Sequence, residues 1–139
     1  MKNKIIRFGV SLPKELVEKF DKFRKSKNYP TRSKAIGDLI REFLIKKEWE
    51  ENKEIAGAIT LIYNHHKRGV LDKVTDVQHD FPGLIISTQH IHLDEDNCLE
   101  IIAIRGNSKE AQRLRDKLRA IKGVKHVNLC MSSTGKEIE

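Results

Sequence analysis

The chain has 139 residues, a formal net charge of +7, 38% hydrophobic and 34% charged residues, and two cysteines. This length suits one ordinary domain or two small ones, and the composition is that of a soluble globular protein. The sequence has no apolar run near the ~18 residues of a membrane span, no recognisable signal peptide and too few cysteines for a disulfide scaffold, so we expect a cytoplasmic protein with no membrane partner.

The positive charge is concentrated at the start of the chain. Residues 1–53 contain 15 Lys and Arg against 8 Asp and Glu, whereas residues 54–139 contain 12 of each. This asymmetry favours a basic N-terminal domain, which we place at 1–50, with an acidic partner, and a neutral domain at 51–139. A solvated basic surface without a partner would have the same charge. The residue pattern therefore has to distinguish a surface that binds an acidic partner from one that does not.

The N-terminal pattern predicts a strand and two helices. Residues 6–12 alternate apolar and polar side chains, which is typical of a strand. Pro13 suits the first turn of a helix, and apolar side chains follow it at helical spacing. The stretch "KNYP" at 27–30 ends this helix, and Thr31 can cap a second one.

A single strand with two helices cannot bury a sufficient core, and its strand would have no partner. Two chains remove both problems if they pair their strands antiparallel about a two-fold axis, so we expect an obligate dimer. The resulting ribbon is narrow enough to enter the major groove of double-stranded DNA. Its outward-facing side chains would be Arg7, Gly9 and Ser11.

The stretch "IRFGVSLPKELVEKFDKFRKSKNYPTRSKAIGDLIREFL" resembles a ribbon-helix-helix DNA-binding domain. The resemblance assigns the base-facing ribbon positions to Arg7, Gly9 and Ser11, and the start of the second helix, where a phosphate can bind, to Thr31, Arg32 and Ser33. An arginine is the side chain best suited to guanine, whereas a glycine can read no base and favours close approach instead.

The second half predicts the order βαββαβ. Strand-like stretches cover residues 54–65, 83–93, 98–106 and 123–133. Helical spacing covers residues 68–81, and a further helix is capped by Asn107 or Ser108. This order is the ferredoxin-like motif, and the module resembles the ACT-like fold. The predicted fold class is therefore α+β, with a ribbon-helix-helix domain before a ferredoxin-like or ACT-like domain.

A candidate metal site lies in the third predicted strand and its surroundings. His90 and His92 are two residues apart, so both imidazoles project from one face of the strand. Cys98 begins the return strand of the hairpin, and His79, near the end of the preceding helix, is a fourth candidate from the same or another chain. Either strand histidine alone would favour a structural role, but the combination favours a metal.

The donor types narrow the choice of ion. Paired cysteines at the spacing of structural zinc sites are absent, and copper(I) prefers a donor set richer in sulfur. Three nitrogens and one sulfur suit planar nickel(II). Spacing alone leaves nickel and zinc open.

The stretches "VQHDF" and "STQHIHLDEDNCLEI" resemble the nickel site of the NikR family, whose members are nickel-responsive ribbon-helix-helix repressors. The resemblance extends over nearly the whole chain. It implies one Ni(II) per subunit of a homotetramer built as a dimer of dimers, with one ligand donated by a neighbouring subunit. The implied ligands are His79, which is the donated one, His90, His92 and Cys98. Glu100 and Tyr63 fall on family positions that imply supporting residues, which orient the ligands, although Tyr63 could equally be a core residue only. Gln78, beside His79, is a further candidate for a supporting residue.

These features predict a nickel-responsive repressor in which Ni(II) at the tetramer core strengthens binding to an inverted-repeat operator. The resemblance also implies a second cation site, formed by two acidic residues on the second helix. Asp38 matches one of them, but Lys34 stands at the other position, and a protonated lysine cannot bind a cation. The site is therefore either absent here or replaced by the ammonium group.

Other classes of function stay open. A ribbon-helix-helix regulator could respond to another metal or to a small metabolite, and a metabolite response would not change on chelation. A metal storage or delivery protein would bind no specific DNA. An enzyme is not expected, because four protein ligands leave no open position on the metal. His65 and His66, at a strand end, are interpreted as exposed side chains.

Overall fold

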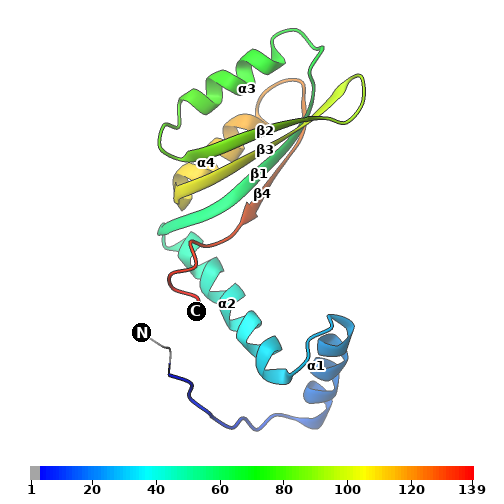
Figure 1. Cartoon of the computed structure of the whole chain (residues 1–139), viewed down its shortest axis with the longest axis vertical. Helices are drawn as coiled ribbons and strands as arrows, with labels where there is room; N and C mark the ends of the chain where they lie inside the picture. Colours follow the sequence, from blue (N-terminus) through cyan, green and yellow to red (C-terminus); the bar gives the residue numbers. More distant parts are fainter. Residues whose placement is uncertain (1–3) are drawn as a thin grey trace. The chain divides into compact units, whose positions relative to one another are not determined.

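The computed structural model describes residues 4–139. Figure 1 shows the elements in chain order. They are α1 (Lys14–Ser26), α2 (Arg32–Glu50), β1 (Glu54–Asn64), α3 (Val70–His79), β2 (Ile85–His92), β3 (Asn97–Asn107), α4 (Ser108–Arg119) and β4 (Val124–Met131). The chain divides into two compact units between Ile40 and Arg41.

The N-terminal unit contains α1 and the first half of α2. Pro13 immediately precedes the first helical residue and does not lie in the first turn. The hydroxyl of Thr31 accepts a hydrogen bond from the backbone N–H of Lys34 at 3.1 Å, which confirms the predicted cap of α2. Asp21 of α1 accepts two hydrogen bonds from Arg32, from Nε at 2.9 Å and from Nη2 at 2.7 Å. This bidentate pair joins the two helices.

The predicted strand at 6–12 is not a hydrogen-bonded strand in this single chain. No strand precedes α1 within residues 4–139. The apolar side chains of the segment are exposed, with 78% of Ile6, 74% of Phe8 and 62% of Val10 accessible. A strand requires a hydrogen-bonding partner, and one copy of the chain offers none here. The pairing of this segment with a second chain stays a prediction.

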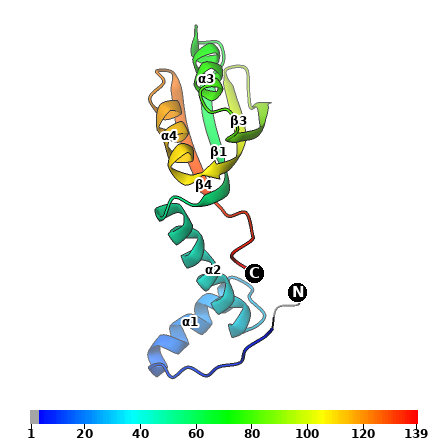
Figure 2. The same ribbon diagram turned by 90° about the vertical axis from the view of Figure 1, so that its left-hand side faces the viewer.

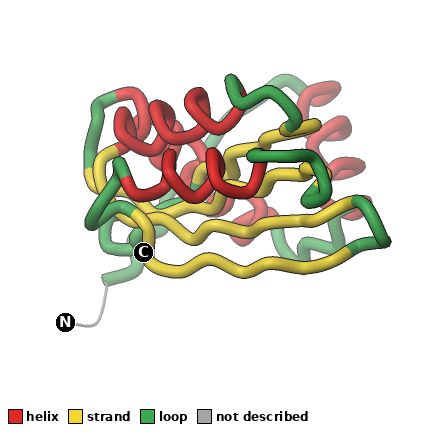
Figure 3. Tube along the Cα trace, turned by 90° about the horizontal axis from the view of Figure 1, so that it is seen from above, coloured by secondary structure: helices red, strands yellow, loops and turns green. Residues whose placement is uncertain are grey.

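The C-terminal unit has the predicted order βαββαβ. Its strands form one antiparallel sheet in the order β2-β3-β1-β4. Helices α3 and α4 lie on one face of this sheet (Figures 2 and 3). Alternate side chains of β1 and β3 point toward these helices and are buried, which is the period-2 pattern of a sheet covered on one side.

The core of this unit lies between the sheet and the two helices. Asn107 caps α4, because its side chain accepts hydrogen bonds from the N–H groups of Lys109 and Glu110. Leu114 and Leu118 of α4 are fully buried, and each such side chain contributes about 1.5–3 kcal/mol. Further buried members of the core are Ile55, Ile59, Leu61, Tyr63, Val70, Val74, Phe81, Leu84, Cys98, Ile102, Ile104, Ala111 and Val127.

The end of α2 belongs to the C-terminal unit and packs within it. Trp49 is 3% exposed, and its Nε1–H donates to the backbone oxygen of Ser132 at 2.8 Å. The hydroxyl of Ser108 donates to the backbone oxygen of Trp49, also at 2.8 Å. The second half of α2 is thus part of the C-terminal unit, and the boundary at residue 50 stays a prediction. Among the described helices, none is both long and apolar enough to cross a lipid bilayer.

Candidate metal centre and DNA-binding surface

The β2–β3 hairpin aligns three of the four predicted metal ligands. His90 lies opposite Glu100 in the antiparallel register, and His92 lies opposite Cys98. Opposed residues in such a pair project from the same face, so all four side chains lie on the face covered by the helices. Cys98 is also opposite Tyr63 of β1, and both are buried. Two imidazoles, a thiol, a carboxylate and a phenol therefore meet at one end of the sheet.

His90 is held by two of the predicted supporting residues. Its Nε2 lies 2.6 Å from Oε1 of Glu100, and its Nδ1 lies 3.3 Å from the hydroxyl of Tyr63. If Nε2–H donates to the carboxylate, Nδ1 is free to accept from the phenol, and one tautomer satisfies both contacts. Both ring nitrogens are then engaged, so His90 must release one partner to bind a metal.

Gln78 extends this network to α3. Its Nε2–H donates to the second oxygen of Glu100 at 3.2 Å, and its Oε1 accepts a hydrogen bond from the hydroxyl of Thr88 at 3.2 Å. Thr88 was not among the residues predicted from the sequence. Its position two residues before His90, on the same face of the same strand, is the signal that could have revealed it.

Burial governs the ionisation of this network. Glu100 is 1% exposed, and burial raises the pKa of its carboxyl, although His90 and Gln78 act in the opposite direction. Burial also raises the pKa of Tyr63, with further contributions from Glu100 and Cys98. Tyr63 is thus a neutral hydrogen-bond donor at ordinary pH.

His79 is separate from the other three candidate ligands. It is the last residue of α3 and is exposed, next to Gln78, whose side chain turns toward Glu100. As the side chains stand, residues 4–139 contain no group of three or more His, Cys, Asp or Glu that could hold a metal ion. The chain therefore supplies candidate ligands at two places without joining them into one complete site.

The donor set at the hairpin nevertheless fits a borderline transition metal. Two imidazoles and a thiol are the donors that such an ion prefers, and the thiol lies on a rigid strand with little access to water. Glu100 is a buried carboxylate that contacts one of the imidazoles, an arrangement common behind metal-binding histidines.

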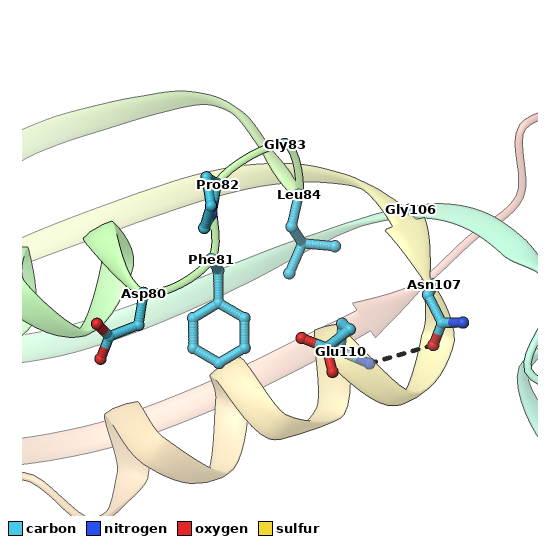
Figure 4. Close-up of a pocket in the computed structure, with 8 residues that line it drawn as sticks. All are labelled: Asp80, Phe81, Pro82, Gly83, Leu84, Gly106, Asn107 and Glu110. Carbon is cyan, nitrogen blue, oxygen red and sulfur yellow. Dashed lines mark hydrogen bonds between the residues drawn. The ribbon is translucent and has the colours of Figure 1, made fainter.

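A concave surface near the start of α4 contains none of the predicted ligands. It has a volume of about 290 Å³, and Figure 4 shows the residues that line it. The ring of Phe81 lies 5.5 Å from the guanidinium carbon of Arg113 and 5.4 Å from Nζ of Lys117. The lining residues are Asp80, Phe81, Pro82, Gly83, Leu84, Gly106, Asn107 and Glu110.

The predicted DNA-contacting residues are all accessible to solvent. Arg7, Gly9 and Ser11 lie in the exposed segment before α1, and a Cβ atom added to Gly9 would have no neighbour within 4 Å. Thr31, Arg32 and Ser33 are exposed around the start of α2. Arg32 donates to Asp21 through Nε and Nη2, and its Nη1 takes no part in these two hydrogen bonds.

Comparison with known proteins identifies the family. Residues 56–132 match the family model described as the NikR C terminal nickel binding domain. The chain belongs to the NikR family. It is 57% identical over 132 residues to a Syntrophus aciditrophicus protein named "Putative nickel-responsive regulator", with 95% of this chain and 96% of the relative covered. A Thermococcus kodakarensis protein of the same name is 50% identical over 136 residues, with 97% and 99% covered.

Some solved structures resemble about half of the chain. An uncharacterized protein from Thermotoga maritima gives a TM-score of 0.50 at 17% identity and covers 55% of this chain and 95% of its own. The ACT domain of a GTP pyrophosphokinase from Chlorobium tepidum gives a TM-score of 0.49 at 23% identity and covers 55% of this chain and 99% of its own. The strand order β2-β3-β1-β4 and the similarity to the Thermotoga maritima protein both support the ferredoxin-like architecture.

Proposed function

We propose that the chain binds one Ni(II) per subunit through His79, His90, His92 and Cys98, and that this binding strengthens its attachment to operator DNA. As a NikR-family member, the chain is a nickel-responsive transcriptional regulator and not an enzyme. The observation that carries the proposed site is the register of β2 and β3, which puts His92 opposite Cys98 and His90 opposite a buried carboxylate.

The supporting residues have separate roles in this proposal. In the metal-free chain Glu100 and Tyr63 hold the two ring nitrogens of His90, and Gln78 holds Glu100 from α3. One of the two contacts gives way when the ion binds, the other orients the ring, and the carboxylate of Glu100 would balance the charge of the ion. Nickel supplies a centre of positive charge that three nitrogens and one thiolate can share. The thiol proton of Cys98 would leave when the sulfur binds the ion, whereas a neutral imidazole binds through its lone pair and keeps its N–H.

A neighbouring subunit completes the site in this proposal. His79 is exposed on α3, and the described residues of one chain do not assemble a three-ligand group. Donation of His79 by a neighbour would join two chains at each nickel. A homotetramer that is a dimer of dimers gives every subunit one such neighbour.

The N-terminal unit supports dimerisation and DNA binding. Its apolar residues line a hollow of about 370 Å³ that is open to solvent, and the segment before α1 exposes Phe8 and Val10. A second copy can cover these surfaces and pair with residues 6–12, so that Arg7, Gly9 and Ser11 of both chains face the major groove. The N-terminus of α2, with Thr31, Arg32 and Ser33, can then bind a phosphate of the DNA backbone.

The proposed metal site and the DNA-binding surface are coupled through the affinity for nickel, which differs between arrangements of the tetramer. Nickel can strengthen DNA binding only if the DNA-competent arrangement of the tetramer binds nickel more tightly than the other arrangements. Two ribbon dimers on one inverted repeat add avidity when the spacing of the half-sites suits both. Because basic residues contact phosphates, binding should weaken as salt rises.

Mixing two inactive variants tests the shared site. A His79→Ala chain keeps His90, His92 and Cys98, and a Cys98→Ser chain keeps His79, so neither variant alone has four ligands. In mixed tetramers, prepared by co-expression, a shared site joins the intact halves of the two variants at some interfaces. We expect recovery of part of the nickel–thiolate absorbance. A site within one chain would give no recovery, and that result would contradict the proposal.

A further inference from the structure

The end of α3 is anchored by a side chain that follows the helix. Within α3 only Val70 and Val74 are buried, and both lie in its first half, whereas Val77 in the last turn is partly buried. His79, the ligand that we propose is donated to a neighbour, is the last residue of the helix and is exposed. Two residues later, Phe81 is 3% exposed. Phe81 is therefore the buried side chain nearest to His79 along the chain.

Hydrogen bonds of the backbone join Phe81 firmly to the last turn of α3. The N–H of Phe81 donates to the backbone oxygen of Gln78 at 3.1 Å, and the N–H of Leu84 donates to the backbone oxygen of Phe81 at 3.3 Å. Gly83, with a φ of 82°, supplies the left-handed conformation of this second turn. Only one residue separates Phe81 from His79, so a displacement of Phe81 moves His79 with it.

Two cations of α4 hold the ring of Phe81. The guanidinium carbon of Arg113 lies 5.5 Å from the ring centroid, and Nζ of Lys117 lies 5.4 Å from it. These residues are four apart and lie on one face of the helix. Arg113 is itself oriented by Glu110, because its Nη1 donates to the carboxylate at 2.7 Å. A cation is attracted to the negative face of an aromatic ring, so both contacts favour one position of Phe81.

Helix α4 is a firm base for this contact. Its Leu114 and Leu118 are fully buried, and Figure 4 shows the ring of Phe81 directed toward the helix. The other side-chain contacts that hold the last turn of α3 include the hydrogen bonds of Gln78, to Glu100 and from Thr88, both at 3.2 Å. Water can replace a hydrogen bond, whereas removal of a buried ring leaves a cavity.

We propose that Phe81 is a positioning residue for nickel binding, whose ring fixes the last turn of α3 against α4 and so presents His79 in the orientation that the shared site needs. This inference rests on the proposed function, since it assumes that His79 is a nickel ligand. Phe81 does not bind the ion and acts only through His79. Its loss should therefore weaken nickel binding only in chains that have His79.

A double-mutant cycle in the full-length protein tests this role. Competition with a chelator measures the nickel affinity of the wild type, Phe81→Leu, His79→Ala and the chain with both changes. Leucine keeps an apolar side chain in the core but offers the two cations no aromatic face. Val127→Ala is the control, because it removes part of a buried side chain from β4, at the opposite edge of the sheet from β2.

Amide hydrogen exchange of the metal-free protein provides a second measurement, which needs no nickel. We expect the amides of residues 76–79, in the last turn of α3, to exchange about tenfold faster in Phe81→Leu than in the wild type. The amides of α4 should exchange at the wild-type rate, because Leu114 and Leu118 still hold that helix in the core.

We expect Phe81→Leu to weaken nickel binding about tenfold when His79 is present and to have no effect in the His79→Ala chain. Val127→Ala should change neither nickel affinity nor exchange at residues 76–79. Equal weakening in both backgrounds, unchanged affinity or exchange in Phe81→Leu, or an equal loss in Val127→Ala would overturn the inference while the proposed function stands. Wild-type affinity in His79→Ala would instead overturn the proposed ligand set and the inference with it.

Discussion

The carboxylate of Glu100 and the imidazole of His90 face each other across the β2–β3 hairpin, with Oε1 and Nε2 2.6 Å apart. Glu100 is 1% exposed, and its second oxygen accepts a hydrogen bond from Gln78. A carboxylate at this depth is costly unless positive charge compensates it. A cation bound at the proposed metal centre would supply such a charge.

Replacing Glu100 with glutamine should therefore weaken nickel binding. The amide keeps the size of the side chain but removes its charge, and loss of a residue behind a metal-binding histidine typically costs about 10–100-fold in affinity. Competition with a chelator of known affinity measures the change. Asp116→Asn, on the exposed surface of α4, is the control. Equal affinity of Glu100→Gln and the control would show that Glu100 does not support the metal.

The ring of Tyr63 packs in the core and its hydroxyl contacts His90, and one substitution separates these two roles. Tyr63→Phe keeps the buried ring but removes the hydroxyl, which lies 3.3 Å from Nδ1 of His90. We expect the free energy of unfolding of the metal-free protein to fall by only about 1 kcal/mol. Nickel affinity should fall several-fold, because His90 loses an orienting contact. A change in stability without any change in nickel affinity would make Tyr63 a core residue only.

Much of this site follows from sequence, because strand geometry is local. Two-residue spacing puts His90 and His92 on one face, and a short turn returns Cys98 to the neighbouring strand, as the register confirms. The contact of His65 with His92 could not be predicted, because it depends on the conformation of two separate turns. Residues 6–12 form no strand in this structure, and their predicted pairing partner is a second copy of the chain.

The ion pair between Asp21 and Arg32 predicts a pH dependence of stability. Hydrogen bonds and the charge of Arg32 lower the pKa of Asp21 to about 2 from its ordinary value of 3.8. The folded state therefore holds the ionised carboxylate more favourably than the unfolded state does. This contribution is fully present above about pH 4 and disappears as the pH falls toward 2.

Asp21→Asn should remove this dependence. Urea unfolding of the full-length protein between pH 2 and pH 7 measures it. We expect the variant to be less stable than the wild type at pH 7 and equally stable near pH 2. A constant difference between the two proteins over the whole range would mean that the ionisation of Asp21 contributes nothing.

The pair of Lys34 and Asp38 predicts how DNA binding responds to potassium, the ion used here to probe the second cation site that the family resemblance implies. Nζ of Lys34 lies 2.7 Å from Oδ1 of Asp38, one helical turn away. The ammonium group thus occupies a position beside the carboxylate that a second cation site would use. We expect wild-type DNA binding to be equal in potassium and sodium chloride at the same ionic strength. Lys34→Glu should bind more tightly in potassium, and a potassium requirement in the wild type would contradict this replacement.

The most direct test of the central claim is titration of metal-free protein onto the DNA upstream of its own gene, with nickel or zinc added in turn. Cys98→Ser is the control, because it removes the thiol from the proposed site. Tight, sequence-specific binding with nickel, weaker binding with zinc and loss of the nickel effect in Cys98→Ser are the predicted results. DNA binding that is indifferent to both metals and to the substitution would contradict the account.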